Sequence, residues 1–158
     1  MKTIVTKRRH VILVSDEDYE TVSKHKWYCC KSGRTRYAST VLHGGSIMTM
    51  HRMILNAPEG VLVDHKDRNG LNNQRENLRL CTSSENNRNK ISLVGNNSYK
   101  GAAFHKASGL FHCTIAVNNR QISGGYFKTA IEAARKYDEL AVLHHGEFAL
   151  TNRRLGLL

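Results

Sequence analysis

Residues 61–89 constrain the fold of this chain more than any other stretch. Two short apolar alternations, at 61–63 and 78–80, predict two short strands on either side of a polar, asparagine-rich loop. Residues 82–85, Thr-Ser-Ser-Glu, follow the second strand, and their hydroxyl and carboxylate have the spacing that caps the start of a helix. The stretch therefore predicts strand, loop, strand and helix in direct succession.

Polar side chains in this stretch are of the types that bind a hard cation and move a proton. Asp64 and His65 end the first predicted strand, Asn77 precedes the second, and Asn86 faces back from the predicted helix. A carboxylate oxygen, an amide oxygen and an imidazole that converge suit one divalent cation and one general base. An Asp-His pair alone is usually a surface feature and an asparagine-rich loop is usually a turn, but the ordered set favours an active site.

This pattern resembles the HNH endonucleases, which have the ββα-metal fold, in a phage subgroup similar to homing endonucleases. The resemblance implies that His65 is the general base and that Asp64 and Asn86 bind the metal ion. It also implies that Asn77 holds the loop and orients the base. Asparagine stands at position 86 where many relatives have the last histidine, which favours one Mg²⁺ or Mn²⁺ per active site over zinc. No other cofactor is predicted.

Charge and composition favour a nucleic-acid partner. The chain has 158 residues and a formal net charge of +11, and its basic residues are spread along the sequence. Such a chain most often binds nucleic acid, with an anionic membrane surface as the second possibility. No apolar run approaches the roughly 20 residues that span a bilayer, and no segment has a signal-peptide core. We therefore expect action in a reducing cytoplasm, that of a phage-infected bacterial host, without a membrane partner.

Cysteine spacing argues against a zinc ribbon or a redox motif. The four cysteines form no Cys-x-x-Cys pair. Cys29 and Cys30, which are adjacent, follow Trp27-Tyr28 and are interpreted as ordinary strand residues.

Residues 1–60 predict a mainly β lead-in. Ser15 is a candidate N-cap for a short helix whose first turn is acidic. A helical turn is expected over 51–55, where His51 and Arg52 either contact DNA or pack, and packing is slightly favoured. Glycines separate the expected strands, which cover 11–14, 27–30, 36–42 and 47–50.

Residues 99–152 predict a second unit of three strands and one helix. Residues 129–132 have capping-box spacing and precede an alanine-rich segment with helical periodicity. The polar, turn-rich residues 91–98 predict a linker. The second strand, 110–115, alternates, with Phe111, Cys113 and Ile115 on one face and His112 and Thr114 on the other.

This second unit resembles the AP2 DNA-binding domain. The resemblance rests on Tyr-Lys-Gly at 99–101, Gly-Tyr-Phe at 125–127 and the segments 133–138 and 146–149, although Phe111 stands where a tryptophan is usual. In that family the sheet lies in the major groove and the helix braces its back. The resemblance implies that outward-facing strand residues contact DNA, and the candidates are His105, Lys106, His112, Thr114, Arg120 and Gln121.

The sequence thus predicts an α+β protein in two parts. An HNH endonuclease domain with a β-rich lead-in is expected at 1–90, with its core at 51–90. A linker at 91–98 then leads to an AP2-like DNA-binding domain at 99–152, a three-stranded antiparallel sheet with one helix. The expected activity is metal-dependent hydrolysis of phosphodiester bonds in double-stranded DNA, by nicking or by paired nicks from two copies on the DNA. No protein partner other than such a second copy is implied.

Two other classes of function compete with this interpretation. One is a DNA-binding regulator that retains the nuclease core as a scaffold, but a scaffold has no need of the polar set in residues 64–86. The other is an RNA-binding protein, which fits the charge equally well. The chain lacks the interleaved aromatic residues expected of a surface that stacks single strands.

Overall fold

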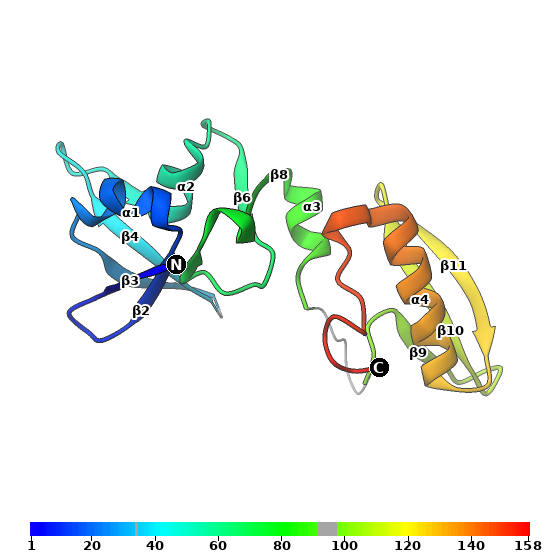
Figure 1. The fold of residues 1–158 in the computed structure, drawn as a ribbon. Helices are drawn as coiled ribbons and strands as arrows, with labels where there is room; N and C mark the ends of the chain where they lie inside the picture. The colour runs from blue at the N-terminus through cyan, green and yellow to red at the C-terminus, as the bar shows by residue number, and fades with distance from the viewer. Residues whose placement is uncertain (34, 92–97) are drawn as a thin grey trace. The chain divides into compact units, whose positions relative to one another are not determined.

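The computed structural model describes residues 1–33, 35–91 and 98–158, and these form two compact units. Unit 1 comprises Met1–Asn86 and unit 2 comprises Asn87–Leu158. Figure 1 shows the elements of both units, each of which is described by itself below. Of the linker expected at 91–98, residues 92–97 lie outside the described residues.

Unit 1 contains three small sheets. The first has the order β1-β2-β7, in which β2 pairs antiparallel with β1 and parallel with β7. The second is the antiparallel meander β3-β4-β5, and the third is the antiparallel pair β6-β8. The strands are β1 (Lys2–Val5), β2 (Val11–Val14), β3 (Tyr28–Ser32), β4 (Thr35–Val41), β5 (Ile47–Thr49), β6 (Leu62–His65), β7 (Asn72–Asn73) and β8 (Leu78–Cys81).

The helices α1 (Asp16–Ser23) and α2 (Met50–Leu55) pack with these sheets around one apolar core. The 3₁₀ turn η1 (Arg75–Asn77) precedes β8, and α3 (Ser83–Arg88) follows it and extends across the border of the two units. Burial of apolar surface is the main stabilising contribution in such a unit. The core residues are Ile12, Val14, Val22, Trp27, Ala38, Met50, Ile54 and Leu78.

The expected helix after Ser15 is confirmed, but Ser15 does not cap it with its side chain. Ser15 occupies the N-cap position of α1 without a side-chain cap bond. Its Oγ instead accepts a hydrogen bond of 2.8 Å from the backbone N–H of Arg75. The Arg75 guanidinium also contacts Asp18 on α1, with 2.8 Å between nitrogen and oxygen. These contacts fix α1 against η1, which directly precedes β8.

Unit 2 is a three-stranded antiparallel sheet covered on one face by a long helix, as Figure 1 shows. Its elements are β9 (Ala102–His105), β10 (Leu110–Val117), β11 (Arg120–Phe127), α4 (Ala130–His145) and the 3₁₀ turn η2 (Gly146–Phe148). The expected capping box is present: Thr129 Oγ1 accepts from Glu132 N–H at 3.2 Å, and the Glu132 carboxylate accepts from Thr129 N–H at 3.1 Å. Thr129 therefore fixes the start of α4 directly after β11.

Small residues let α4 lie close to the sheet. Ala133, Ala134 and Ala141 are fully buried at this interface, together with the Tyr137 ring. Gly101, with φ of 74°, lies against that ring so closely that a Cβ would clash with it. The alternation expected for 110–115 is confirmed, because Cys113 and Ile115 are buried under α4.

Candidate active site

Asp64 and His65 lie at the end of β6, where pairing with β8 fixes their orientation. In this antiparallel pair Asp64 is opposite Arg79 and His65 is opposite Leu78. Both side chains are buried, with 6% of Asp64 and 4% of His65 exposed. Two adjacent ionisable side chains with so little exposure are rare without partners or a function.

Asp64 forms a buried ion pair with Arg79, its cross-strand neighbour. Asp64 Oδ2 accepts from Arg79 Nε at 2.9 Å and from an Arg79 terminal nitrogen at 2.6 Å. A carboxylate removed from water needs such compensation, because an unpaired buried charge is strongly destabilising. Arg79 was not among the residues predicted from the sequence, and the observed register of β6 and β8 places it opposite Asp64.

Asn77 ties the loop after His65 to the start of β8. Its backbone oxygen accepts from Lys66 N–H at 2.8 Å, and its Oδ1 accepts from Asp67 N–H at 3.0 Å. Its Nδ2 donates to Asp67 Oδ1 at 2.9 Å and to the Asn72 backbone oxygen at 2.8 Å. One side chain therefore fixes both ends of the loop between β6 and η1.

His65 lies within a cluster of rings from three separate elements. The centroid of its ring is 5.0 Å from that of His51 on α2 and 5.8 Å from that of Tyr37 on β4. Burial lowers the pKa of His65 below its ordinary value, while hydrogen bonding with the Asn73 side chain and the charges of Asp67 and Asp64 act in the opposite direction.

His51 and Arg52 pack inside unit 1, which agrees with the favoured alternative from the sequence. His51 Nε2 lies 3.0 Å from Thr49 Oγ1, and burial, followed by the charges of His65 and Arg52, lowers the pKa of His51 to about 3. The Arg52 guanidinium donates to the backbone oxygens of Val61, Ala57 and Pro58 at 2.6–3.0 Å. Arg52 thus holds the turn that leads into β6.

Asn86 lies on α3, whose start is fixed by the expected capping box. Thr82 N–H donates to the Glu85 carboxylate at 2.8 Å, and Glu85 N–H donates to Thr82 Oγ1 at 3.2 Å. The Asn86 side chain is half-buried. Asp64, His65 and Asn77 thus lie at neighbouring ends of the paired strands β6 and β8, and Asn86 lies on the helix that follows β8.

No cluster of three or more His, Cys, Asp or Glu side chains able to hold a metal ion occurs among the described residues. The ligand pair expected from the sequence is of a different kind, because it combines one carboxylate with one amide. Mg²⁺ is often held by one or two protein oxygens and completes its coordination with water and substrate phosphate. The donor set of Asp64 and Asn86 therefore fits Mg²⁺ or Mn²⁺ but does not form a closed protein cage.

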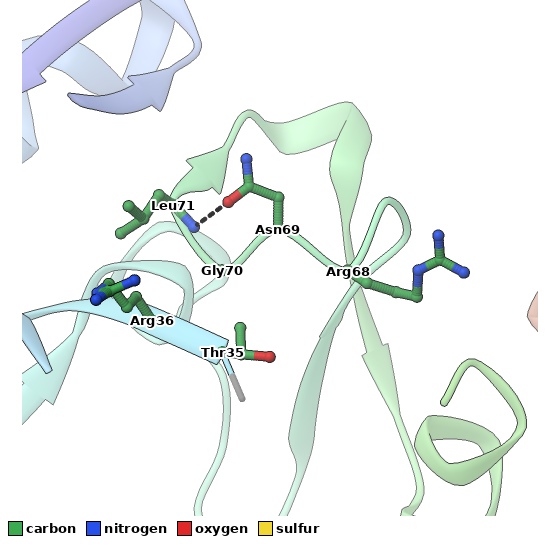
Figure 2. A pocket seen from close by; sticks show the side chains of 6 residues that line it. All are labelled: Thr35, Arg36, Arg68, Asn69, Gly70 and Leu71. Carbon is green, nitrogen blue, oxygen red and sulfur yellow. Dashed lines mark hydrogen bonds between the residues drawn. The ribbon is translucent and has the colours of Figure 1, made fainter. Parts of the chain in front are cut away.

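An open hollow lies between β4 and the loop after β6, close to the rings of Tyr37, His51 and His65. Figure 2 shows the guanidinium groups of Arg36 and Arg68 on opposite sides of it, pointing away from each other. Among the described lining residues, Arg36 and Arg68 therefore do not converge on a single phosphate. Its lining residues are Thr35, Arg36, Arg68, Asn69, Gly70 and Leu71.

The outward face of the unit 2 sheet carries a row of rings. His112 on β10 is paired with Tyr126 on β11, and their rings stack with centroids 4.4 Å apart. Tyr126 also meets the edge of the His105 ring on β9, at 5.3 Å. A ring nitrogen of each histidine is also engaged, because His105 Nδ1 lies 2.9 Å from Ser108 Oγ and His112 Nε2 lies 2.9 Å from Ser123 Oγ. The sequence analysis missed Tyr126, which is 48% exposed.

The six DNA-contacting candidates do not share one face. His105, His112, Thr114 and Gln121 lie on the outward face, because cross-strand partners point to the same side of a sheet. Lys106 is exposed in the turn after β9. Arg120 pairs with Val117, which packs on the helix side, so Arg120 lies on the other face at the end of the sheet. This placement differs from the outward one expected from the sequence.

Charge in unit 2 is divided between the sheet and the helix. No Asp or Glu occurs between Glu85 and Glu132, so the charged residues of the strands and their turns are all Lys or Arg. The carboxylates of unit 2 are on α4 or η2: Glu132, Asp138, Glu139 and Glu147. No helix in the described part of the chain has the length and apolar character needed to cross a membrane.

Comparison with known proteins shows the family of this chain. The family model of the HNH endonucleases matches residues 56–88, the segment that holds Asp64, His65, Asn77 and Asn86. An uncharacterised HNH endonuclease of Acanthamoeba polyphaga mimivirus is 32% identical over 154 residues, which cover 89% of this chain and 73% of the relative. No solved structure matches significantly. The chain therefore belongs to the HNH endonuclease family.

Proposed function

We propose that this protein hydrolyses phosphodiester bonds in double-stranded DNA, with His65 as the general base. The observation that carries the proposal is the end of β6, where a buried histidine adjoins a buried carboxylate and Asn77 ties down the loop that follows. Membership of the HNH endonuclease family supports DNA as the substrate. The net charge of +11 supports a polyanionic substrate as well.

His65 performs the proton transfer in this proposal. Its neutral ring takes a proton from a water molecule while the water oxygen forms a bond to phosphorus, and the bond from phosphorus to the 3′ oxygen breaks. A positioned base of this kind contributes about 10²- to 10⁴-fold to a rate. Asn77 acts on His65 indirectly, since it holds the backbone of Lys66 and Asp67 in place.

Asp64 and Asn86 would hold one divalent cation, and their oxygen donors suit Mg²⁺ or Mn²⁺. When bound, such an ion neutralises the charge that develops on the phosphate and on the departing oxygen. Arg79 orients the Asp64 carboxylate through its two hydrogen bonds to Oδ2. This arrangement keeps the carboxylate in a fixed position beside His65.

Unit 2 would supply DNA recognition, as the similarity of its sequence to the AP2 domain implies. Its strands and the turns that flank them contain Lys or Arg but no Asp or Glu, which matches a polyanion. The polar groups of Tyr126, Thr114 and Gln121 on this face can bond to base edges in a major groove. Because His112 and Tyr126 stack on each other, one face of each ring is closed to a base, which favours duplex over stacked single strands as the ligand.

The nuclease proposal is tested by cleavage of supercoiled plasmid in Mg²⁺, Mn²⁺ or EDTA, with the wild-type protein and His65→Ala. We expect metal-dependent open-circle product from the wild type, and at least about 10²-fold slower cleavage by His65→Ala with nearly unchanged DNA affinity. Equal losses of cleavage and affinity would make His65 a contact residue. Binding without cleavage by the wild type would favour the regulator.

The metal assignment has its own test in Asp64→Ala and Asn86→Ala. Both substitutions should raise the metal concentration needed for half-maximal cleavage, and Asp64→Ala more so because it removes a charge. Zinc should be unnecessary for folding, because no thiolate cluster exists in the described part of the chain. Loss of circular dichroism on chelation alone would contradict this assignment.

The division of labour in unit 2 is tested by Gln121→Ala and Arg120→Ala in the full chain. Gln121 lies on the outward face, so its loss should relax preference at one base pair by about 1–3 kcal/mol. Arg120 lies on the other face, so its loss should weaken all duplexes alike and reduce the salt slope by about one. Competition binding over a duplex panel at two salt concentrations separates these outcomes, and the opposite pattern would invert the two assignments.

A further inference from the structure

The rings of His51, Tyr37 and His65 form a cluster of polar side chains, which packing alone does not require. His51, Tyr37 and His65 contact one another pairwise, with ring centroids 5.0–5.8 Å apart and ring planes at 51–85°. They come from α2, β4 and β6, which are separated in sequence and packed together in unit 1. Burial of polar rings costs desolvation free energy that burial of leucine side chains would not cost.

Neighbouring residues restrict the positions of the His51 and Tyr37 rings. Met50, the residue before His51, is fully buried in the core of unit 1, and Thr49 Oγ1 lies 3.0 Å from His51 Nε2. Tyr37 is backed by Gly70, where an added Cβ would lie 2.7 Å from a ring carbon of Tyr37. The loop at Gly70 can therefore approach the ring only because it has no side chain. Both rings are thus fixed by the backbone elements that carry them.

We propose that His51 and Tyr37 are positioning residues, whose rings hold the His65 imidazole in the one orientation that aims its lone pair at the attacking water. This inference rests on the proposed role of His65 as the base. An imidazole side chain rotates about two bonds, and the edge of His51 and the tilted ring of Tyr37 restrict both rotations. A misplacement of about 1 Å can cost about 10²-fold in rate, so restriction of this kind has a kinetic value.

Burial leaves His51 without a role of its own in proton transfer. Its Nδ1 is buried and has no hydrogen-bond partner within the described residues. The low pKa of His51, about 3, keeps the ring neutral at neutral pH, so it places no positive charge beside His65. A neutral, fixed ring suits a positioning role, whereas a charged one would repel a proton from the base.

The test compares ring-removing and ring-retaining variants of the full chain. We expect His51→Leu and Tyr37→Leu to lower kcat of plasmid cleavage by about 10- to 100-fold with KM changed by less than about threefold. His51→Phe and Tyr37→Phe keep the ring contact and should recover kcat to within about fivefold of the wild type. His25→Leu is the matched control, because it removes a similar edge contact, with Trp27 at 6.0 Å, in the same unit.

Several outcomes would overturn the inference. It fails if His51→Leu cleaves like the wild type, if His25→Leu lowers kcat as much, or if the Phe variants are as slow as the Leu variants. If the Leu variants do not fold, the wild-type protein decides: His65 must give one set of ring-proton signals, with Overhauser contacts to the rings of His51 and Tyr37. Two interconverting sets would refute it. Cleavage by His65→Ala at the wild-type rate would instead refute the proposed function.

Discussion

The buried pair of Asp64 and Arg79 offers the sharpest quantitative prediction. Their side chains are only 7% and 8% exposed, and the closest nitrogen–oxygen distance is 2.6 Å. Arg79→Leu removes the cation and leaves the carboxylate buried without its partner, which costs about 3–5 kcal/mol. Asp64→Asn should cost less than Arg79→Leu, because it leaves a cation on a longer and more adaptable side chain.

Urea unfolding of the wild type, both single variants and the double variant measures the coupling between the two residues. The double variant should be more stable than the sum of the single losses predicts, by at least about 1 kcal/mol. Residues in direct contact normally show coupling of about 0.5–3 kcal/mol. A coupling near zero would mean that the pair does not stabilise the fold, and our account of β6 and β8 would be wrong.

The same variants also test whether a metal ion binds at Asp64. Arg79→Leu removes a cation that competes with a metal ion for the Asp64 carboxylate, so Mn²⁺ should raise the unfolding midpoint of Arg79→Leu more than that of the wild type. The double variant, which lacks the carboxylate, should respond least. An equal response of all proteins to Mn²⁺ would show that the ion binds elsewhere.

Three further predictions concern packing. The pKa of His51 is lower in the folded chain than the ordinary 6.5 of an unfolded one, so the unfolded chain takes up the proton first and stability falls as the pH drops below about 6.5. The contribution of His51 between pH 7 and 5 is up to about 2 kcal/mol, and urea midpoints of His51→Phe should fall less over that range. Burial raises the pKa of Cys81 and Cys113 to about 11, so iodoacetamide at pH 8 should label them only as the protein unfolds, and rapid labelling of the native protein would contradict their burial. Gly101→Ala should destabilise unit 2 by more than about 1 kcal/mol in thermal unfolding, since a Cβ would clash with the Tyr137 ring, and an unchanged midpoint would disprove that close approach.

Local signals explain what the sequence predicted correctly. Residues 82–85 and 129–132 each carry both halves of a capping box, and both helices begin where those residues indicate. The alternations at 61–63 and 78–80 correspond to β6 and β8 within one or two residues. In each of these places the signal and the structure involve neighbouring residues.

The features that were missed depend on residues far apart in the chain. β7 consists of Asn72 and Asn73. It forms because these residues pair with Leu13 and Val14 of β2, which precede them by nearly sixty positions in the sequence. The contact of His51 with His65 likewise requires α2 to pack against β6, which no periodicity reveals. The face of Arg120 has a local explanation instead, because adjacent residues of a strand point to opposite faces and Arg120 and Gln121 therefore cannot both lie on the outward face.

The separation of charge in unit 2 also affects how the protein would reach its substrate. The strands and their turns carry Lys or Arg without carboxylates, whereas α4 and η2 carry four carboxylates that Arg135 and Lys136 offset only in part, so the unit has an electric dipole across its thickness. In the field of a duplex this dipole produces a torque that turns the sheet toward the DNA before contact. A larger fraction of collisions then occurs with the sheet facing the DNA. The association rate would therefore depend on ionic strength more steeply than the net charge alone implies, because salt screens the torque together with the attraction.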